Sequence, residues 1–171
     1  RLYVLTAPRD ALPLDIVTPT DVKAIINLAR EAFDYVIIDM PQALMNWSEP
    51  VYTASDLFLA VMEVDMRSAQ NMFRFLRTLK TEGMALEKLV FTLNRAPGMT
   101  DFSGKSRVSR VAESLGITYS YLVPDGGKQV VNACDQGIPL LEVAKSNPVR
   151  KEIARMVKQV VMLDQETAKA G

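Results

Sequence analysis

The chain has 171 residues, of which 20 are basic, 20 are acidic and 49% are hydrophobic. This length suits one domain with a substantial core. The balanced charge provides no electrostatic footprint for nucleic acid, so we expect no nucleic-acid partner. The sequence contains no histidine, which excludes Ser-His-Asp catalysis, Cys-His catalysis and every histidine metal site. The single cysteine, Cys134, excludes a disulfide framework and is expected to be a small core residue.

The sequence shows neither a membrane-spanning segment nor a signal peptide, and these features bear on where the protein is located. No stretch approaches the roughly 18 apolar residues that a membrane span needs, and no signal peptide is visible. We therefore expect a cytoplasmic protein. The chain begins at Arg1, without methionine, and enters an apolar run at once. We interpret it as a fragment of a longer protein, cut just before a strand.

Apolar runs alternate with helical patterns along the chain. The runs predict strands at residues 2–7, 35–38, 57–62, 88–93 and 119–123. Apolar spacing and capping residues predict helices at about 19–33, 68–82, 103–115, 128–135 and 148–163. Strands that alternate with helices indicate βαβ units and a parallel sheet. The sequence thus predicts one α/β domain over residues 1–171, with a Rossmann-like, mostly parallel sheet flanked by helices.

Polar side chains follow three of the predicted strands. Asp39 and Asn94 each come directly after an apolar run, and Asp125 comes after Pro124. Because the carboxyl ends of parallel strands lie along one edge, the three could face a common crevice. A carboxylate for magnesium-bound water and an amide for a purine ring would suit a nucleotide. A structural interpretation stays open, because all three residue types also stabilise loops and turns.

The sequence contains only part of a nucleotide site. An acid at the end of a buried strand, such as Asp39, matches the Walker B arrangement that holds magnesium. Yet no Gly-x-x-x-x-Gly-Lys-Ser/Thr phosphate loop occurs in the chain.

Four segments in this order resemble the MinD/ParA family of deviant P-loop ATPases. They are residues 33–41, 54–61, 89–95 and the late segment from Pro124 to Leu140. More narrowly, Asp39-Met40-Pro41 with Trp47-Ser48 downstream resembles the TadZ/CpaE branch, which serves type IV (Flp/Tad) pilus assembly. The resemblance covers nearly the whole chain.

The resemblance implies a P-loop NTPase fold truncated at the N-terminus, so that the chain is the C-terminal part of an ATPase domain. Asp39 matches the Walker B acid, which acts on magnesium through water. Asn94, followed by Arg95, matches the amide that contacts adenine. Pro124 and Asp125 match the loop that borders the base. ATP and magnesium are thus the implied cofactors of the full-length parent, whereas this fragment is expected to contain no catalytic residue and to bind neither tightly.

The chain departs from the family in two ways. Gln42-Ala43-Leu44-Met45 stands where MinD-like proteins usually have a glycine, as in the pilus branch. The P-loop strand, which lies in the middle of the family's sheet beside the Walker B strand, is absent. Its loss would expose two strand edges with unpaired backbone groups. We therefore expect that a partner chain fills the gap or that the flanking strands close together.

The function that the resemblance implies is localisation and assembly of the pilus machinery. The implied partners are a second copy of the chain and pilus or secretion proteins, in the cytoplasm, at a pole or peripherally at the inner membrane. Alternatives are a division-site or plasmid- or chromosome-positioning ATPase, or a non-enzymatic scaffold, so hydrolysis by the parent is left open. A phospho-receiver domain is disfavoured, because the first strand lacks the acidic pair that it would need and the last lacks a lysine.

Overall fold

The structure is a computed structural model that describes residues 2–6, 9–10, 13, 16–98, 100–143 and 145–170, without the side chains of 143 and 163–170. The chain divides into two compact units, Arg1–Asp56 and Leu57–Gly171, and each is described by itself. We call them the first unit and the second unit. The α/β class is confirmed. The single-domain organisation stays a prediction.

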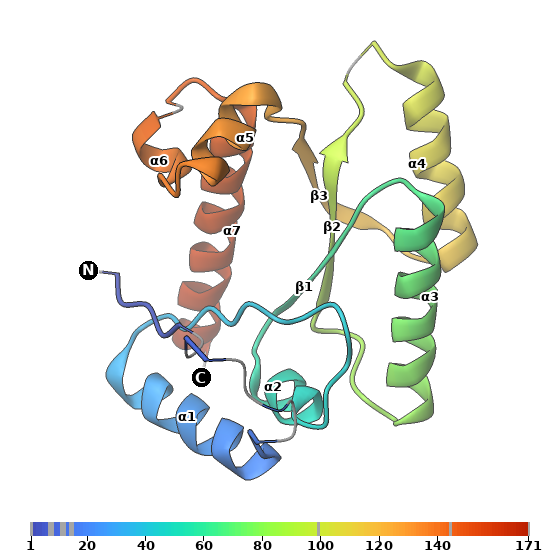
Figure 1. The fold of residues 1–171 in the computed structure, drawn as a ribbon. Helices are drawn as coiled ribbons and strands as arrows, with labels where there is room; N and C mark the ends of the chain where they lie inside the picture. Colours follow the sequence, from blue (N-terminus) through green and yellow to red (C-terminus); the bar gives the residue numbers. More distant parts are fainter. Residues whose placement is uncertain are drawn as a thin grey trace. The chain divides into compact units, whose positions relative to one another are not determined.

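A three-stranded parallel sheet forms the centre of the second unit (Figure 1). Its strands are β1 (Phe58–Met62), β2 (Leu89–Ala96) and β3 (Tyr119–Pro124), in the order β1-β2-β3. The connections between them are α3 (Met66–Thr81) and α4 (Phe102–Leu115), so the chain forms two successive βαβ units. The parallel sheet predicted from alternating strands and helices is confirmed in this unit.

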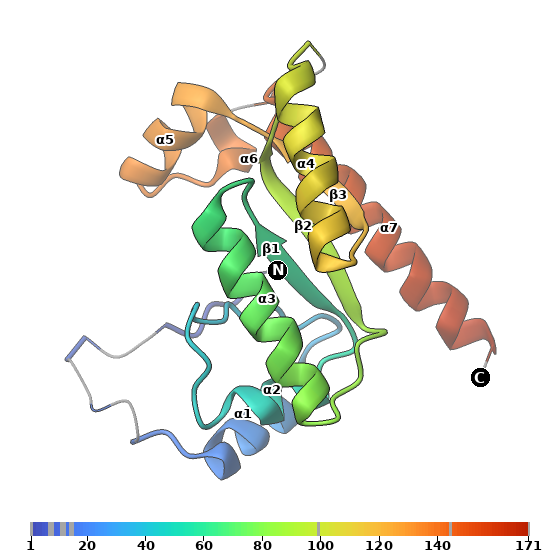
Figure 2. The ribbon, with the colours of Figure 1, turned by 90° about the vertical axis from the view of Figure 1, so that its right-hand side faces the viewer.

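Helices lie over both faces of this sheet. In Figures 1 and 2, α3 and α4 lie together over one face, and α7 (Pro148–Ala170) lies over the other. The core of this unit includes the buried strand residues Ala60, Met62 and Leu93. Only alternate residues of β1 and β3 are buried, and Leu59, Val61 and Leu122 are 41%, 58% and 50% exposed. The described helices therefore leave part of one face of the sheet uncovered, although its strands are apolar on both sides. Helix α7 runs beyond residue 163, where the sequence predicted its end.

Carboxylate caps position α3 and α4. Asp65 accepts a hydrogen bond from the backbone N–H of Ser68 at 2.9 Å, and Asp101 accepts one from Gly104 at 2.8 Å. Such caps satisfy N–H groups that have no partner inside the helix. Position 104 also requires glycine, because a Cβ there would collide with the Asp101 side chain and with the Cβ of Pro97.

Two short helices follow β3 in the second unit. They are α5 (Gly127–Asp135) and α6 (Leu140–Val143), and α6 was not predicted. Cys134 lies on α5 and is exposed, so its expected place in the core is wrong. The reason is the orientation of the helix, which buries the neighbouring Ala133 instead.

The first unit contains helices α1 (Pro19–Ala32) and α2 (Ser48–Ala54). Thr18 and Asp21 form a capping box at the start of α1. Arg30 joins the two helices, because its guanidinium donates to the Ala54 carbonyl at 2.7 Å and pairs with Asp56 at 3.2 Å. The sequence predicted no helix at α2. Pro50 is nevertheless tolerated there because it lies in the first turn, where its missing N–H has no intrahelical partner to lose.

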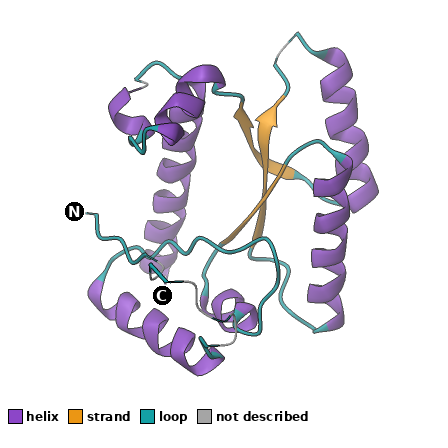
Figure 3. Ribbon diagram, in the orientation of Figure 1, coloured by secondary structure: helices purple, strands orange, loops and turns teal. Residues whose placement is uncertain are grey.

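The strands predicted in the first unit are wrong as far as the structure describes them. Residues 2–6 form a loop, and residue 7 lies outside the described part. Residues 35–38 also form a loop (Figure 3), and Ile37 is 95% exposed. A strand needs a neighbour that completes its ladder of hydrogen bonds, and no described strand pairs with this run. Closure by the flanking strands is therefore not found among the described residues, and a partner chain that fills the gap stays a prediction.

Candidate nucleotide-binding edge of the sheet

The carboxyl ends of β1 and β2 bring three polar side chains together. Glu63 directly follows β1, and Asn94 and Arg95 lie near the end of β2. The Asn94 amide nitrogen Nδ2 donates to Glu63 Oε1 at 3.2 Å, and Arg95 Nε lies 3.6 Å from the same oxygen. Sequence reasoning missed Glu63. The signal was available, because Glu63 is the first polar residue after an apolar run, as Asp39 and Asn94 are.

A bulge in β2 sets the direction of these side chains. The sequence predicted that Asn94 ends this strand, whereas the strand continues to Ala96. Leu93 pairs with Leu122 and Ala96 pairs with Pro124, so β2 has one residue more than β3 in this interval. Arg95 has a φ of 49°, in the left-handed region that side chains other than glycine rarely adopt. Such a conformation costs on the order of 1 kcal/mol, and bulges are frequent beside functional sites, where they redirect side chains.

The contact with Glu63 fixes which way the Asn94 amide faces. An ionised carboxylate only accepts hydrogen bonds, so the Asn94 NH₂ group must point to Glu63. Its carbonyl oxygen Oδ1 is then left to accept a hydrogen bond from a ligand. A purine with an amino group at its six position offers a donor there, whereas a purine with a carbonyl offers an acceptor. An acceptor held in this orientation can bind the amino group of adenine.

A small hollow of about 200 Å³ opens at the same edge, between the starts of α3 and α4. Its charged lining includes Glu63, Arg95, Asp101 and Arg107. Hydrogen bonds from the Gly104 N–H and the Ser103 hydroxyl, with Arg107 nearby, hold the pKa of Asp101 below its ordinary value. The hollow is smaller than the roughly 300–1,000 Å³ of a typical ligand pocket. It could therefore hold only part of a nucleotide-sized ligand.

The loop after β3 adds Pro124 and Asp125 to this edge. Pro124 pairs with Ala96 in the sheet, so it lies beside the end of β2. The Asp125 carboxylate accepts from the Gly127 N–H at 2.7 Å, which is the turn-forming role that the sequence left open. Buried Asn147 holds the loop from the side of α7, because its Nδ2 donates to the Gly126 carbonyl at 3.0 Å. Sequence reasoning missed Asn147, which shows no motif of its own.

Asp39, the predicted magnesium residue, lies in the first unit. It is exposed and follows the loop at residues 35–38. The structure therefore brings together Asn94, Arg95, Pro124 and Asp125, and it does not relate Asp39 to them. Among the residues that the structure describes, no three acidic or cysteine side chains gather as a metal site.

The polar groups at this edge of the second unit could serve only one part of a nucleotide. Asn94 can accept from a base, and the loop at Pro124 and Asp125 can border it. The sequence has no phosphate loop, and so it offers no comparable cradle for phosphates. The residues present fit the base and not the phosphate chain.

Comparisons with known proteins agree with this fold. No protein-family model matches the chain. The septum site-determining protein MinD of Thermotoga maritima is 25% identical over 140 residues, which are 81% of this chain and 51% of that protein. A ParA family ATPase from Chlorobium tepidum superposes with a TM-score of 0.73 at 20% identity, over 82% of this chain and 57% of that chain. The cell division ATPase MinD of Pyrococcus furiosus superposes with a TM-score of 0.63 at 18% identity, over 85% of this chain and 59% of that chain.

These comparisons relate the chain to the MinD/ParA-type deviant P-loop ATPases, and they confirm the fold class. The chain spans about half the length of the curated relative that it matches. No helix in the described residues is long and apolar enough to cross a membrane.

Proposed function

We propose that this chain is part of a MinD/ParA-like ATPase of the TadZ/CpaE type, which acts in localisation and assembly of type IV (Flp/Tad) pilus machinery. The observation that carries the nucleotide part of this proposal is the contact between Glu63 and Asn94 at the carboxyl end of the sheet. It presents an oriented acceptor for a base at the edge where open α/β sheets bind ligands. The sequence similarity to MinD supports the same class.

The pilus branch is supported by residues of the first unit. Asp39-Met40-Pro41 is followed by Gln42-Ala43-Leu44-Met45, without the glycine that MinD-like proteins usually have. Trp47 lies half-buried directly before α2 and is the second feature that resembles this branch.

Roles for the site residues follow from this proposal. Asn94 contacts adenine, Arg95 accompanies it, and Pro124 and Asp125 border the base. Asp39 acts on magnesium through water once residues outside this chain supply the phosphate loop. Nucleotide binding then favours a homodimer that recruits pilus or secretion proteins in the cytoplasm, at a pole or peripherally at the inner membrane. The chain by itself neither hydrolyses ATP nor binds it tightly.

A second candidate is positioning of the division site, because the curated relative is a septum site-determining protein. Deletion of the gene in its source organism separates the two. The pilus proposal predicts loss of surface pili with normal cell length, measured by electron microscopy and cell-size distribution. Misplaced septa and minicells with normal pili would overturn it in favour of the division-site function.

Calorimetry on the chain with ATP and magnesium tests the nucleotide part. We expect no tight binding, because the phosphate cradle that supplies most contacts to the charged end of ATP is missing. Micromolar affinity of the chain alone for ATP would contradict the proposal that the chain supplies contacts to the base but not to the phosphates.

A further inference from the structure

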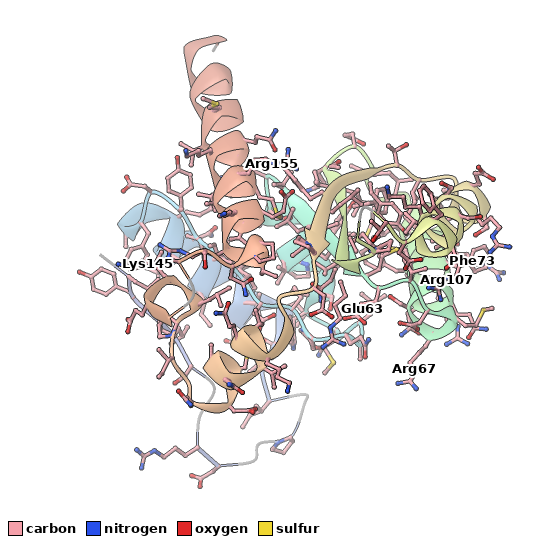
Figure 4. All side chains as sticks on the ribbon, turned by 90° about the horizontal axis from the view of Figure 1, so that it is seen from above. Glu63, Arg67, Phe73, Arg107, Lys145 and Arg155 are labelled. Atoms are coloured by element: carbon pink, nitrogen blue, oxygen red, sulfur yellow. The ribbon has the colours of Figure 1, made fainter. Side chains whose placement is uncertain are left out.

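Helices α3 and α4 present a concentrated positive charge in a chain of zero net charge. Helix α3 contains four basic residues and no acid, and α4 contains three basic residues and one acid, Glu113. All seven of these cations are exposed. We call six of them the basic face: Arg67, Arg74, Arg77 and Lys80 of α3 with Arg107 and Arg110 of α4. In Figure 4, Arg67 and Arg107 are labelled on the side of the molecule that α3 and α4 form.

The packing of α3 directs its cations outward. Met72 and Leu79 are buried and lie one above the other on the inner side of the helix. Arg67, Arg74 and Arg77 fall on the opposite side at helical spacing, and the two helices lie together over the sheet (Figure 2). The basic face is therefore the outer surface of this layer.

This arrangement weakens the helices that carry it. Arg74 and Arg77, Arg77 and Lys80, and Arg107 and Arg110 are like charges three residues apart, a spacing that destabilises a helix. No salt bridge in the described part of the chain involves the basic face. In α7, by contrast, Arg155 pairs with Glu152 at the same spacing. Arg107 is partly compensated by Asp101, whose pKa it helps to lower. A surface that serves only solubility intersperses both signs, so the other cations of this face indicate a binding surface.

Apolar side chains among the cations narrow the class of partner. Phe73 is 55% exposed and Met66 is 74% exposed, both on the outer part of α3. A nucleic-acid backbone would pair with the arginines but would leave these two side chains in water. Aromatic residues and arginine together are typical of the centres of protein interfaces. Phe73 is labelled on the same side of the molecule in Figure 4.

A lipid surface fits this face less well. A helix that binds a membrane sinks an apolar face into the lipid and keeps its cations at the border. The apolar side of α3 is already occupied by the core, through Met72 and Leu79. Its outer side carries charge with only scattered apolar groups.

We propose that the basic face binds an acidic, amphipathic helix of a partner protein. Carboxylates at helical spacing on that helix pair with Arg67, Arg74 and Arg77, and an apolar side chain between them covers Phe73. Arg67, Arg74 and Arg77, which carry this interaction, do not line the hollow at the carboxyl edge of the sheet. The interaction can therefore fail without loss of nucleotide binding, and the reverse also holds.

The test uses a labelled helical peptide of about 20 residues, long enough to be helical in part, with glutamates on one face and leucines beside them. Two other ligands are compared with the peptide: a DNA duplex of equal charge and phosphatidylglycerol vesicles. Fluorescence anisotropy measures the affinity of the chain for the peptide and the DNA, and sedimentation measures its affinity for the vesicles. We expect the chain to bind the peptide most tightly. Arg74→Glu with Arg77→Glu should weaken peptide binding by at least about tenfold, because attraction becomes repulsion. Phe73→Ser should weaken it by about tenfold as an interface anchor.

Lys151→Glu with Lys158→Glu on α7 is the matched control, because it reverses the same charge at exposed positions away from the basic face. Circular dichroism checks that each variant stays folded. The proposal is overturned if the peptide does not bind, if DNA or vesicles bind as tightly, if the control weakens binding equally, or if Phe73→Ser changes nothing.

Discussion

The two units contain similar apolar runs, and only one of them turns these runs into strands. In the second unit, residues 58–62 form β1, with Ala60 and Met62 buried in the core. In the first unit, residues 35–38 are just as apolar and form a loop with Ile37 almost fully exposed. The chemistry of the residues is alike in the two places. The presence of a neighbouring strand is what differs.

This difference shows what an apolar run specifies. It specifies burial, but its hydrogen bonds must be completed by another strand. β1 has β2 beside it, with a continuous parallel register from Phe58 and Leu89 to Met62 and Leu93. The run at 35–38 has no such neighbour among the described residues.

The largest expected difference between the units lies in core substitutions. Leu93→Ala should lower the free energy of unfolding by about 2–5 kcal/mol, because Leu93 is 0% exposed and its truncation leaves a cavity. Ile37→Ala should change it by less than about 0.5 kcal/mol, since exposed side chains contribute little. Urea unfolding followed by circular dichroism measures both. Equal losses of unfolding free energy in the two variants would contradict the difference between the units.

The second prediction concerns the proposed roles of the units in nucleotide binding by a protein that contains this chain together with a phosphate loop. Glu63→Met leaves the Asn94 amide free to turn, so the preference for ATP over GTP should fall by about tenfold, or about 1.4 kcal/mol. Asp39→Asn should reduce the magnesium dependence of affinity and leave the purine preference unchanged. Competition binding with and without magnesium separates the two effects. An unchanged preference in Glu63→Met would show that Glu63 does not orient the amide.

A smaller effect is expected at the cap of α3. Asp65→Ala removes the acceptor for the Ser68 N–H and should cost about 1 kcal/mol of stability. Asp10→Ala, an exposed loop position in the first unit, is the control and should have no measurable effect. Thermal unfolding of both variants provides the measurement, and equal midpoints would contradict the capping role.

The smallest effect is a dependence on pH through the capping carboxylates of both units. Hydrogen bonds from Thr18 lower the pKa of Asp21, and those from Gly104 and Ser103 lower the pKa of Asp101. Because the folded pKa lies below the unfolded value of about 4, this stabilisation is present above that value and is lost as the pH falls through the folded pKa. Asp101→Asn should flatten the acid side of the stability profile. A profile as steep as that of the unmodified chain would exclude this contribution.

The sequence predicted the second unit well because its signals are local and agree with one another. Strands at β1, β2 and β3 coincide with apolar runs, and Gly116, with a φ of 64°, ends α4 as a glycine in that position should. The two strands that failed in the first unit share one physical cause, since pairing depends on a neighbour that a local pattern does not contain.

The candidate site was predicted in part. Asn94 and Pro124 come to one edge of the sheet because parallel strands place their carboxyl ends together. Glu63 was not predicted, although its position after an apolar run was a signal. The bulge at Arg95 could not be predicted, because a bulge depends on how two strands pair and has no signature in a single strand. Asn147 escaped for a similar reason, since its role comes from a loop that is distant in sequence.

Hydrogen–deuterium exchange tests the central claim most directly, namely that residues 35–38 lack a strand partner in this chain. We expect the amides of Val36, Ile37 and Ile38 to exchange at nearly the rate of an unstructured peptide. The amides of Phe91, Thr92 and Leu93 in β2 should exchange only through global opening of the second unit. Equal, strong protection of both segments would show that residues 35–38 form a paired strand and would contradict the account.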